Sequence, residues 1–329
     1  MKTPIKDDPE ELADLIEEES ELDWPKIKRL LPGLPTESLV NLMPGFGLFV
    51  NRMLALEING RKDAVFSLRR FLQNGENWYD AERPFAWAPI HAIHILALNK
   101  SPEALELILE VVRFRSEELG DFLTEDVASL LHNFGPEAIG ALKEFSLDET
   151  LPPFARSAAL RAFCAHAAKN EAYKADAIAF MRSLLKNNRD PDFGASMVDN
   201  LLSLDKSALP EVLAAFHDGR IDPSAGPESE IKELVLGEFN DMFQFELELD
   251  TRNPLDHFSR SNLVHLRNVE KSWEKDDEGR SEQILDLVKA APEKGTSAST
   301  GKGPSKNATC PRGSGKKYKR CCMPDAKRQ

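Results

Sequence analysis

Three cysteines gather near the end of the chain with the spacing of a small metal site. Cys310, Cys321 and Cys322 lie within thirteen residues, and a Gly-Ser-Gly sequence at 313–315 allows a sharp turn between them. Thiolates bind Zn²⁺ at about 2.3 Å, and structural zinc sites take four ligands in a tetrahedron. The chain has four cysteines in all, and three of them in one cluster indicate a metal knuckle rather than a disulfide framework.

Basic residues fill the space between these cysteines. The segment contains four cationic side chains and one aromatic side chain: Lys316, Lys317, Tyr318, Lys319 and Arg320. Cationic groups contact phosphates or an acidic protein surface, and a tyrosine can stack on a base or fill a pocket. We therefore expect a binding segment for a protein partner, or for the ribosome through its RNA. The alternative is a solvated basic tail that only keeps the protein soluble.

The cysteine segment resembles the SEC-C motif, which forms the metal-binding tail of the SecA translocation motor and of many otherwise unrelated bacterial proteins. The matching residues are Cys310, Gly313, Ser314, Gly315, Cys321 and Cys322. The resemblance implies a zinc site and contact with an acidic chaperone surface, the translocation machinery or the ribosome. Arg312 stands where the motif has its second cysteine, and a guanidinium does not deprotonate to bind a metal. Water, another chain or a distant residue must supply a fourth ligand, or zinc is not held.

Charge is unevenly distributed along the chain. The whole sequence has a formal net charge of −13; eleven Lys/Arg and two Asp/Glu from Lys289 onward give the C-terminal part +9, which leaves −22 on residues 1–288. An acidic body repels nucleic acid, so any phosphate contact is expected from the tail. We find neither an apolar stretch of membrane-spanning length nor the apolar core of a secretory signal, and we expect a cytoplasmic protein.

Helical periodicity repeats between residues 85 and 222. The first helices of four pairs are expected at 87–98, 124–133, 155–168 and 194–204. Ser101-Pro102 and Gly135-Pro136 open two of the second helices, 34 residues apart. A two-helix unit of about 35 residues, repeated in series, is typical of an α-solenoid. The irregular spacing favours HEAT-like over tetratricopeptide repeats, and a non-repetitive helical bundle is the alternative.

These patterns predict an all-α fold: a HEAT-like α-α superhelix followed by a flexible linker and a small zinc-knuckle-like motif. We assign residues 1–24 to an acidic N-terminal cap with a helix at 9–21, and 25–290 to the repeat domain. Within that domain a helix is expected at 63–72, and a short strand or helix end at 243–249. Residues 291–309 have linker composition, and 310–325 form the cysteine motif.

Most of the chain also resembles one bacterial family. The helical body, the terminal cysteine motif and the segment Trp87-Ala-Pro89-Ile90-His91-Ala92 together resemble the family known as domain of unknown function 1186. The resemblance implies a HEAT-like body over most of the chain and implies no activity.

The best candidate for catalysis is a cluster of Trp87, His91 and His94, with Asp80 and Glu82 nearby in sequence. Histidines at i and i+3 lie on one face of a helix and could share a ligand or a metal. Isoleucines flank both histidines, however, which favours a packed structural role. We see no Gly-rich phosphate loop, no nucleophile elbow and no His-Glu-x-x-His helix, and we assign no catalytic residue. Cys164 lies on an apolar helix face and is expected in the core.

Two functions follow from these features. The first is a non-catalytic interaction scaffold, in which the acidic helical body and the basic tail each contact a partner. The second is a metal-dependent hydrolase with a site near His91 and His94. A closed polar pocket holding both histidines would favour the hydrolase, whereas histidines packed singly or exposed at the surface would favour the scaffold.

Overall fold

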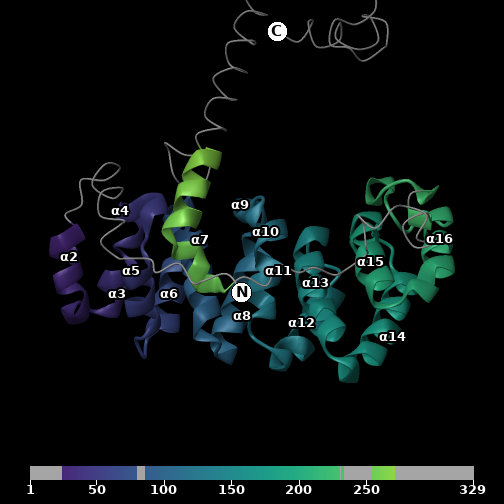
Figure 1. Cartoon of the computed structure of the whole chain (residues 1–329), viewed down its shortest axis with the longest axis horizontal. Coiled ribbons are helices and arrows are strands. Elements are labelled where there is room, and N and C mark those ends of the chain that lie inside the picture. Colours follow the sequence, from purple (N-terminus) through teal and green to yellow (C-terminus); the bar gives the residue numbers. More distant parts are fainter. Residues whose placement is uncertain (1–23, 80–85, 230, 233–252, 271–329) are drawn as a thin grey trace, which may run out of the picture. The chain divides into compact units, whose positions relative to one another are not determined.

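The computed structural model describes residues 24–79, 86–229, 231–232 and 253–270 (Figure 1). Every regular element in these ranges is a helix and none is a strand, which confirms the predicted all-α fold. The described residues all belong to one compact unit. The helix expected at 9–21, the possible strand at 243–249, the linker and the cysteine motif lie outside the described residues. The predicted domain boundaries stay predictions.

The first part of the unit is built from short helices that proline and glycine interrupt. The predicted helix at 63–72 is confirmed, and it begins after Asp63. Asn51 begins the preceding helix, because its side chain accepts hydrogen bonds from the backbone N–H groups of Met53 and Leu54. The elements are α2 (Trp24–Leu30), η2 (Leu31–Gly33), α3 (Thr36–Val40), α4 (Met43–Phe46), η3 (Gly47–Phe49), α5 (Arg52–Asn59), α6 (Ala64–Gln73) and η4 (Gly75–Trp78).

A series of helices follows from Trp87 to His217. Ser101 is the N-cap of the second helix, with its hydroxyl 3.2 Å from the N–H of Ala104. The elements are α7 (Trp87–Asn99), α8 (Pro102–Phe114), α9 (Ser116–Leu119), α10 (Phe122–Glu125), α11 (Val127–His132), η5 (Pro136–Ala138), α12 (Ile139–Leu147), α13 (Pro153–Lys169), α14 (Glu171–Asn187), α15 (Pro191–Leu204), η6 (Lys206–Ala208) and α16 (Leu209–His217).

The helix expected at 124–133 is the one clear error in this region. The chain forms two short helices there, α10 and α11, which meet at Asp126. The φ angle of Asp126 is −109°, far from the value near −63° of a regular α-helix. The next predicted helix also begins differently, because Gly135 adopts φ +84° and Pro136 opens the 3₁₀ turn η5 before α12.

The first helices α7, α11, α13 and α15 contact one another in series, and α7 and α13 also contact the second helices of their pairs, α8 and α14. Contacts join α7 with α8, α11 with α13, α13 with α15, and α14 with α16. Stacked helical repeats require this contact pattern; the HEAT-like classification itself stays a prediction. Buried apolar side chains from Trp24 to Leu263 form one continuous core.

Helix α13 lies inside this stack and is buried on several faces. Its many alanines allow α11, α12, α14 and α15 to approach closely. Cys164 is completely buried, as expected, and burial raises the pKa of its thiol.

Arg156 of α13 is also buried, with 3% of its surface exposed. Its Nε donates to the carbonyl of Ser146 at 3.0 Å. Its guanidinium lies 3.7 Å from the ring centre of Phe193. This arginine therefore links α12, α13 and α15.

The last described segment packs against the middle of the unit. It contains η8 (Pro254–Phe258) and a helix over residues 260–270. The 3₁₀ turn η8 contacts α5 and α7, and Figure 1 shows the segment in yellow-green beside α7. As a result α7 is covered on all sides, and every residue from Trp87 to Ala97 is buried.

Candidate functional site

Three buried histidines meet where η8 packs on α7. His91, His94 and His257 are 0%, 4% and 7% exposed. His91 Nδ1 lies 2.8 Å from His257 Nε2, and the rings of His94 and His257 are stacked with centroids 3.7 Å apart. The two histidines predicted to share one helix face are therefore brought together by a third, which the sequence analysis missed.

The hydrogen bonds determine which ring nitrogens carry protons. His91 Nε2 lies 2.9 Å from the carbonyl oxygen of Gly47, and a carbonyl only accepts, so this nitrogen carries the proton. Nδ1 of neutral His91 is then an acceptor, and His257 Nε2 donates to it. His94 Nδ1 donates to the carbonyl of Ile90 at 2.8 Å. All three rings are thereby held as neutral donors and acceptors.

Burial keeps these imidazoles uncharged. Desolvation lowers the pKa of His91 to about 3, against an opposing hydrogen bond to Gly47. Desolvation also lowers the pKa of His94, although Asp126 acts in the other direction. The pKa of His257 is well below its usual value, first because of burial and then because His94 and His91 lie beside it. A cluster of this kind has no charge near neutral pH.

Trp87 joins the cluster to the end of the described chain. Its indole Nε1 donates to the carboxylate of Glu270 at 3.0 Å, and its ring lies nearly parallel to that of His91 with centroids 6.1 Å apart. Glu270 is 9% exposed. The conspicuous aromatic and histidine residues of α7 thus attach the segment 254–270 to the body.

The cluster of buried histidines is suited to packing the core more than to catalysis or metal binding. His91 and His94 each direct one ring nitrogen at a backbone carbonyl. Across the described ranges, no group of His, Cys, Asp and Glu side chains is arranged to hold a metal ion. Asp80 and Glu82, the carboxylates considered with them, lie outside those ranges.

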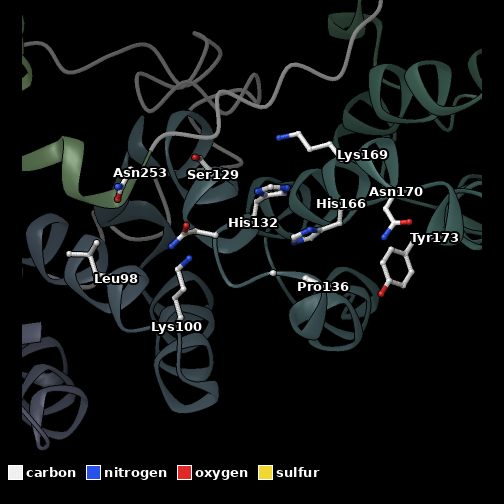
Figure 2. A pocket seen from close by; sticks show the side chains of 12 residues that line it. Leu98, Lys100, Ser129, His132, Pro136, His166, Lys169, Asn170, Tyr173 and Asn253 are labelled. Carbon is white, nitrogen blue, oxygen red and sulfur yellow. The ribbon is translucent and has the colours of Figure 1, made fainter. Parts of the chain in front are cut away.

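A second histidine pair, absent from our sequence prediction, lines a cavity. His132 on α11 and His166 on α13 are stacked with ring centroids 4.1 Å apart and an angle of 16° between the rings. Desolvation, His166 and Lys169 lower the pKa of His132 to about 4; desolvation and then Lys169 lower that of His166. The cavity measures about 740 Å³, and Figure 2 shows both rings at its wall.

The sequence did contain a signal for this pair. His132 and His166 are 34 residues apart, the same distance that separates Pro102 from Pro136 at the starts of successive second helices. Equivalent positions of neighbouring repeats lie side by side in a stack. A search for polar residues that recur at the repeat spacing would have identified it.

The predicted metal and partner residues lie beyond the described residues. These are Cys310, Cys321, Cys322, Lys316, Lys317, Tyr318, Lys319 and Arg320, together with Arg312. In the helices that are described, none is both long and apolar enough to cross a bilayer.

The fold and the buried cluster define an all-α protein of paired helices whose conspicuous histidines are core residues. Residues 51–251 match the sequence model of the family described as protein of unknown function (DUF1186), and the chain belongs to this family. Residues 307–324 match the SEC-C motif. Both resemblances drawn from the sequence are thereby confirmed. No curated protein and no solved structure shows significant similarity to the chain.

Proposed function

We propose that this protein is a non-catalytic interaction protein in which the helical body and the SEC-C tail each contact a partner. The observation that carries the proposal is the SEC-C match at 307–324, a segment with four Lys/Arg between residues 316 and 320. The partner is a protein of the chaperone or translocation machinery, or the ribosome. The tail supplies a basic contact in either case.

The helical body supports an interaction role through its surface. Three phenylalanines on three helices are largely exposed: Phe66 on α6 (64%), Phe114 on α8 (69%) and Phe154 on α13 (59%). Single exposed apolar residues are ordinary, but aromatic side chains are also the type enriched in interfaces. They are the described residues that we would substitute first to find the contact of the body.

The packing of the α7 histidines weighs against the hydrolase. A hydrolytic metal site needs ligand nitrogens that face an open position for water and substrate. His91 and His94 instead face backbone carbonyls and the ring of His257. The metal-dependent hydrolase therefore stays the alternative.

We further propose that Cys310, Cys321 and Cys322 hold zinc. Their donor chemistry fits the metal in part, because three thiols supply three of the four ligands of a structural site and Arg312 occupies the expected position of the fourth. Bound zinc supplies the folding energy of a knuckle too small to have an apolar core. The basic residues between the cysteines lower the thiol pKa values and favour thiolate ligands.

Two contacts on one chain gain affinity through effective concentration. Residues 291–309 have the Gly, Ser, Thr and Lys composition of a linker. Weak binding by the tail and weak binding by the body would therefore combine when one partner, or one assembly, offers both surfaces.

The test is affinity capture with the full chain and with a version that ends at Ala290. We expect the full chain alone to retain one defined ribosomal or chaperone partner. Identical partner sets would make the tail dispensable and would contradict the proposal. Binding to the retained partner is then measured over a range of salt, because a phosphate contact weakens steeply as salt rises through counterion release, whereas a protein contact weakens less.

A further inference from the structure

Large apolar side chains are exposed at the repeat spacing, where second helices of the stack end. Tyr79, Phe114 and Leu147 are 76%, 69% and 52% exposed. The first follows the turn η4 after α6, and the other two are the last residues of α8 and α12. They are 35 and 33 residues apart, and Figure 1 shows α6, α8 and α12 one after another along the unit. Equivalent positions of neighbouring repeats lie side by side, so we call these three residues the apolar row.

Two arginines connect the members of the apolar row. The guanidinium of Arg115 lies 5.6 Å from the ring centre of Trp78, the residue before the first member. The guanidinium of Arg113 lies 2.5 Å from the carboxylate of Asp148, the residue after the last member. Phe114 stands between these two arginines in the sequence. The contacts therefore place Phe114 in the middle of the row.

A hollow of about 150 Å³ lies beside Phe114, between α6 and α8. Buried apolar side chains line it: Leu72, Leu107 and Val111. An apolar side chain of a partner that enters this hollow would leave water and would also contact the ring of Phe114. Single exposed apolar residues are ordinary, whereas an aromatic side chain beside a hollow is typical of the residues that dominate binding energy.

Carboxylates border the apolar row. Glu76, Glu117 and Glu149 are exposed, and each is within three residues of a member of the row. None of the three forms an ion pair with a described residue. The two arginines of this edge, Arg113 and Arg115, are each already paired with a carboxylate. The edge is therefore apolar along its centre and negative beside it, which suits a partner with apolar and cationic side chains.

We propose that the apolar row binds a basic amphipathic helix of a partner protein, a proposal that rests on the interaction role given above. Neighbouring packed helices have axes about 8–10 Å apart, and seven residues of an α-helix span about 10.5 Å. A helix lying across the ends of α6, α8 and α12 would present one apolar side chain to each member of the row if its apolar residues recur every seven positions. Lysines and arginines beside that apolar stripe would meet the carboxylates. The row ends after three members, because the next second helix, α14, finishes with Lys186 and Asn187.

The test uses the full chain and a fluorescent helical peptide of about 20 residues. The peptide has leucines on one face in a seven-residue repeat and lysines beside them, and binding is followed by fluorescence anisotropy. Two control peptides have glutamate in place of lysine, or the same composition in scrambled order. We expect saturable binding of the lysine peptide and much weaker binding of both controls. No saturable binding, or equal binding of the lysine and glutamate peptides, would overturn the proposal.

Two matched phenylalanines show whether the peptide uses the row. Phe114→Ala should weaken binding by at least about tenfold, and the melting temperature should not change because the side chain is exposed. Phe66→Ala removes a ring that is 64% exposed on α6, seven residues before the end of that helix, and should bind as the wild type does. Equal affinity of the Phe114→Ala and wild-type chains would contradict the site. The tail is tested separately by the capture experiment, so that failure would leave the interaction role standing.

Two pairs of carboxylates test the expected charge of the partner. The double variant Glu117→Gln, Glu149→Gln should weaken binding of the lysine peptide and reduce its dependence on salt. Glu103→Gln together with Glu106→Gln, at exposed positions in the first half of α8, should change neither. Equal effects of the two double variants would mean that the peptide responds to the overall charge of the body and would contradict the site.

Other occupants of the row give different results. Binding of the peptide only after Lys316, Lys317, Lys319 and Arg320 are replaced by glutamine would show that the chain's own tail occupies the row. A dimer in analytical ultracentrifugation that Phe114→Ala converts to monomer would show that a second copy occupies it. Either result would overturn the proposal of a partner helix.

Discussion

His257 donates a hydrogen bond to His91 across 2.8 Å, although 166 residues separate the two in sequence. His91 in turn donates a hydrogen bond from Nε2 to the carbonyl oxygen of Gly47. Three distant parts of the unit are joined through two neutral rings. Protonation of either ring would place a charge inside the core and remove an acceptor, so the stability of the unit should depend on pH.

Acidification should destabilise the unit at pH values that are still above those at which carboxylates take up protons. The pKa values of His91, His94, His257, His132 and His166 are all lowered in the folded chain. A lowered histidine pKa means that the unfolded chain binds more protons below about pH 6.5. Stability is therefore complete above that pH and falls as pH decreases towards the folded values, which are about 3 for His91 and about 4 for His132.

Urea unfolding at pH 7.5, 6.5, 5.5 and 5.0 tests this expectation. Each such histidine contributes a slope of up to about 1.4 kcal/mol per pH unit. The half-buried His132 allows a mild substitution, and His132→Gln should reduce the slope. His217→Gln, at a side chain that is 71% exposed, should leave the slope as in the wild type. A free energy of unfolding that stays constant from pH 7.5 to 5.0 would show that the buried histidines are not held neutral.

The indole of Trp87 should control the attachment of residues 254–270. Trp87→Phe removes the donor to the buried carboxylate of Glu270, and the loss of a hydrogen bond to a charged group costs about 2 kcal/mol. Hydrogen exchange in 254–270 should become faster. Trp78→Phe is the matched control, because Trp78 donates to the carbonyl of Leu72 only six residues away. Equal exchange of 254–270 in both variants would contradict this role.

Two glycines should respond in opposite ways to the same substitution. A Cβ on Gly194 would lie 2.0 Å from the carbonyl oxygen of Arg220, a backbone atom, whereas a Cβ on Gly140 meets nothing within 4 Å. Gly194→Ala should destabilise the unit by about 3 kcal/mol through overpacking, and Gly140→Ala in α12 should stabilise it by about 0.5–1 kcal/mol. Thermal and urea unfolding measure both. Two changes of the same sign would mean that the close approach of α15 to Arg220 is wrong.

The SEC-C tail should bind zinc more tightly when its missing ligand is restored. Arg312→Cys provides a fourth thiol where the motif expects one, and a fourth ligand completes the tetrahedron. Competition with a chelator, followed by metal analysis of reduced protein, should show stronger retention in Arg312→Cys than in the wild type and loss in Cys310→Ser. Protein that contains no metal in its reduced wild-type form would refute zinc binding by the three cysteines.

Local features of the fold were predictable from the sequence, whereas contacts between distant segments were not. Ser101 marks the beginning of α8, because capping depends on residues within one turn. The break at Asp126 was missed because apolar spacing continues across it. His257 was missed because nothing within its own segment indicates a partner 166 residues earlier. The two candidate histidines of α7 were identified correctly as a pair. Which groups surround them could be seen only in the packed structure.

The central claim is that the basic tail provides a specific contact for an interaction protein. The most direct measurement is quantitative affinity capture with a variant that carries Lys316→Gln, Lys317→Gln, Lys319→Gln and Arg320→Gln and retains its cysteines. The control carries Arg29→Gln, Lys62→Gln, Lys186→Gln and Lys206→Gln at exposed positions of the body. The account predicts that only the tail variant loses one defined partner. Retention of every partner by the tail variant would contradict it.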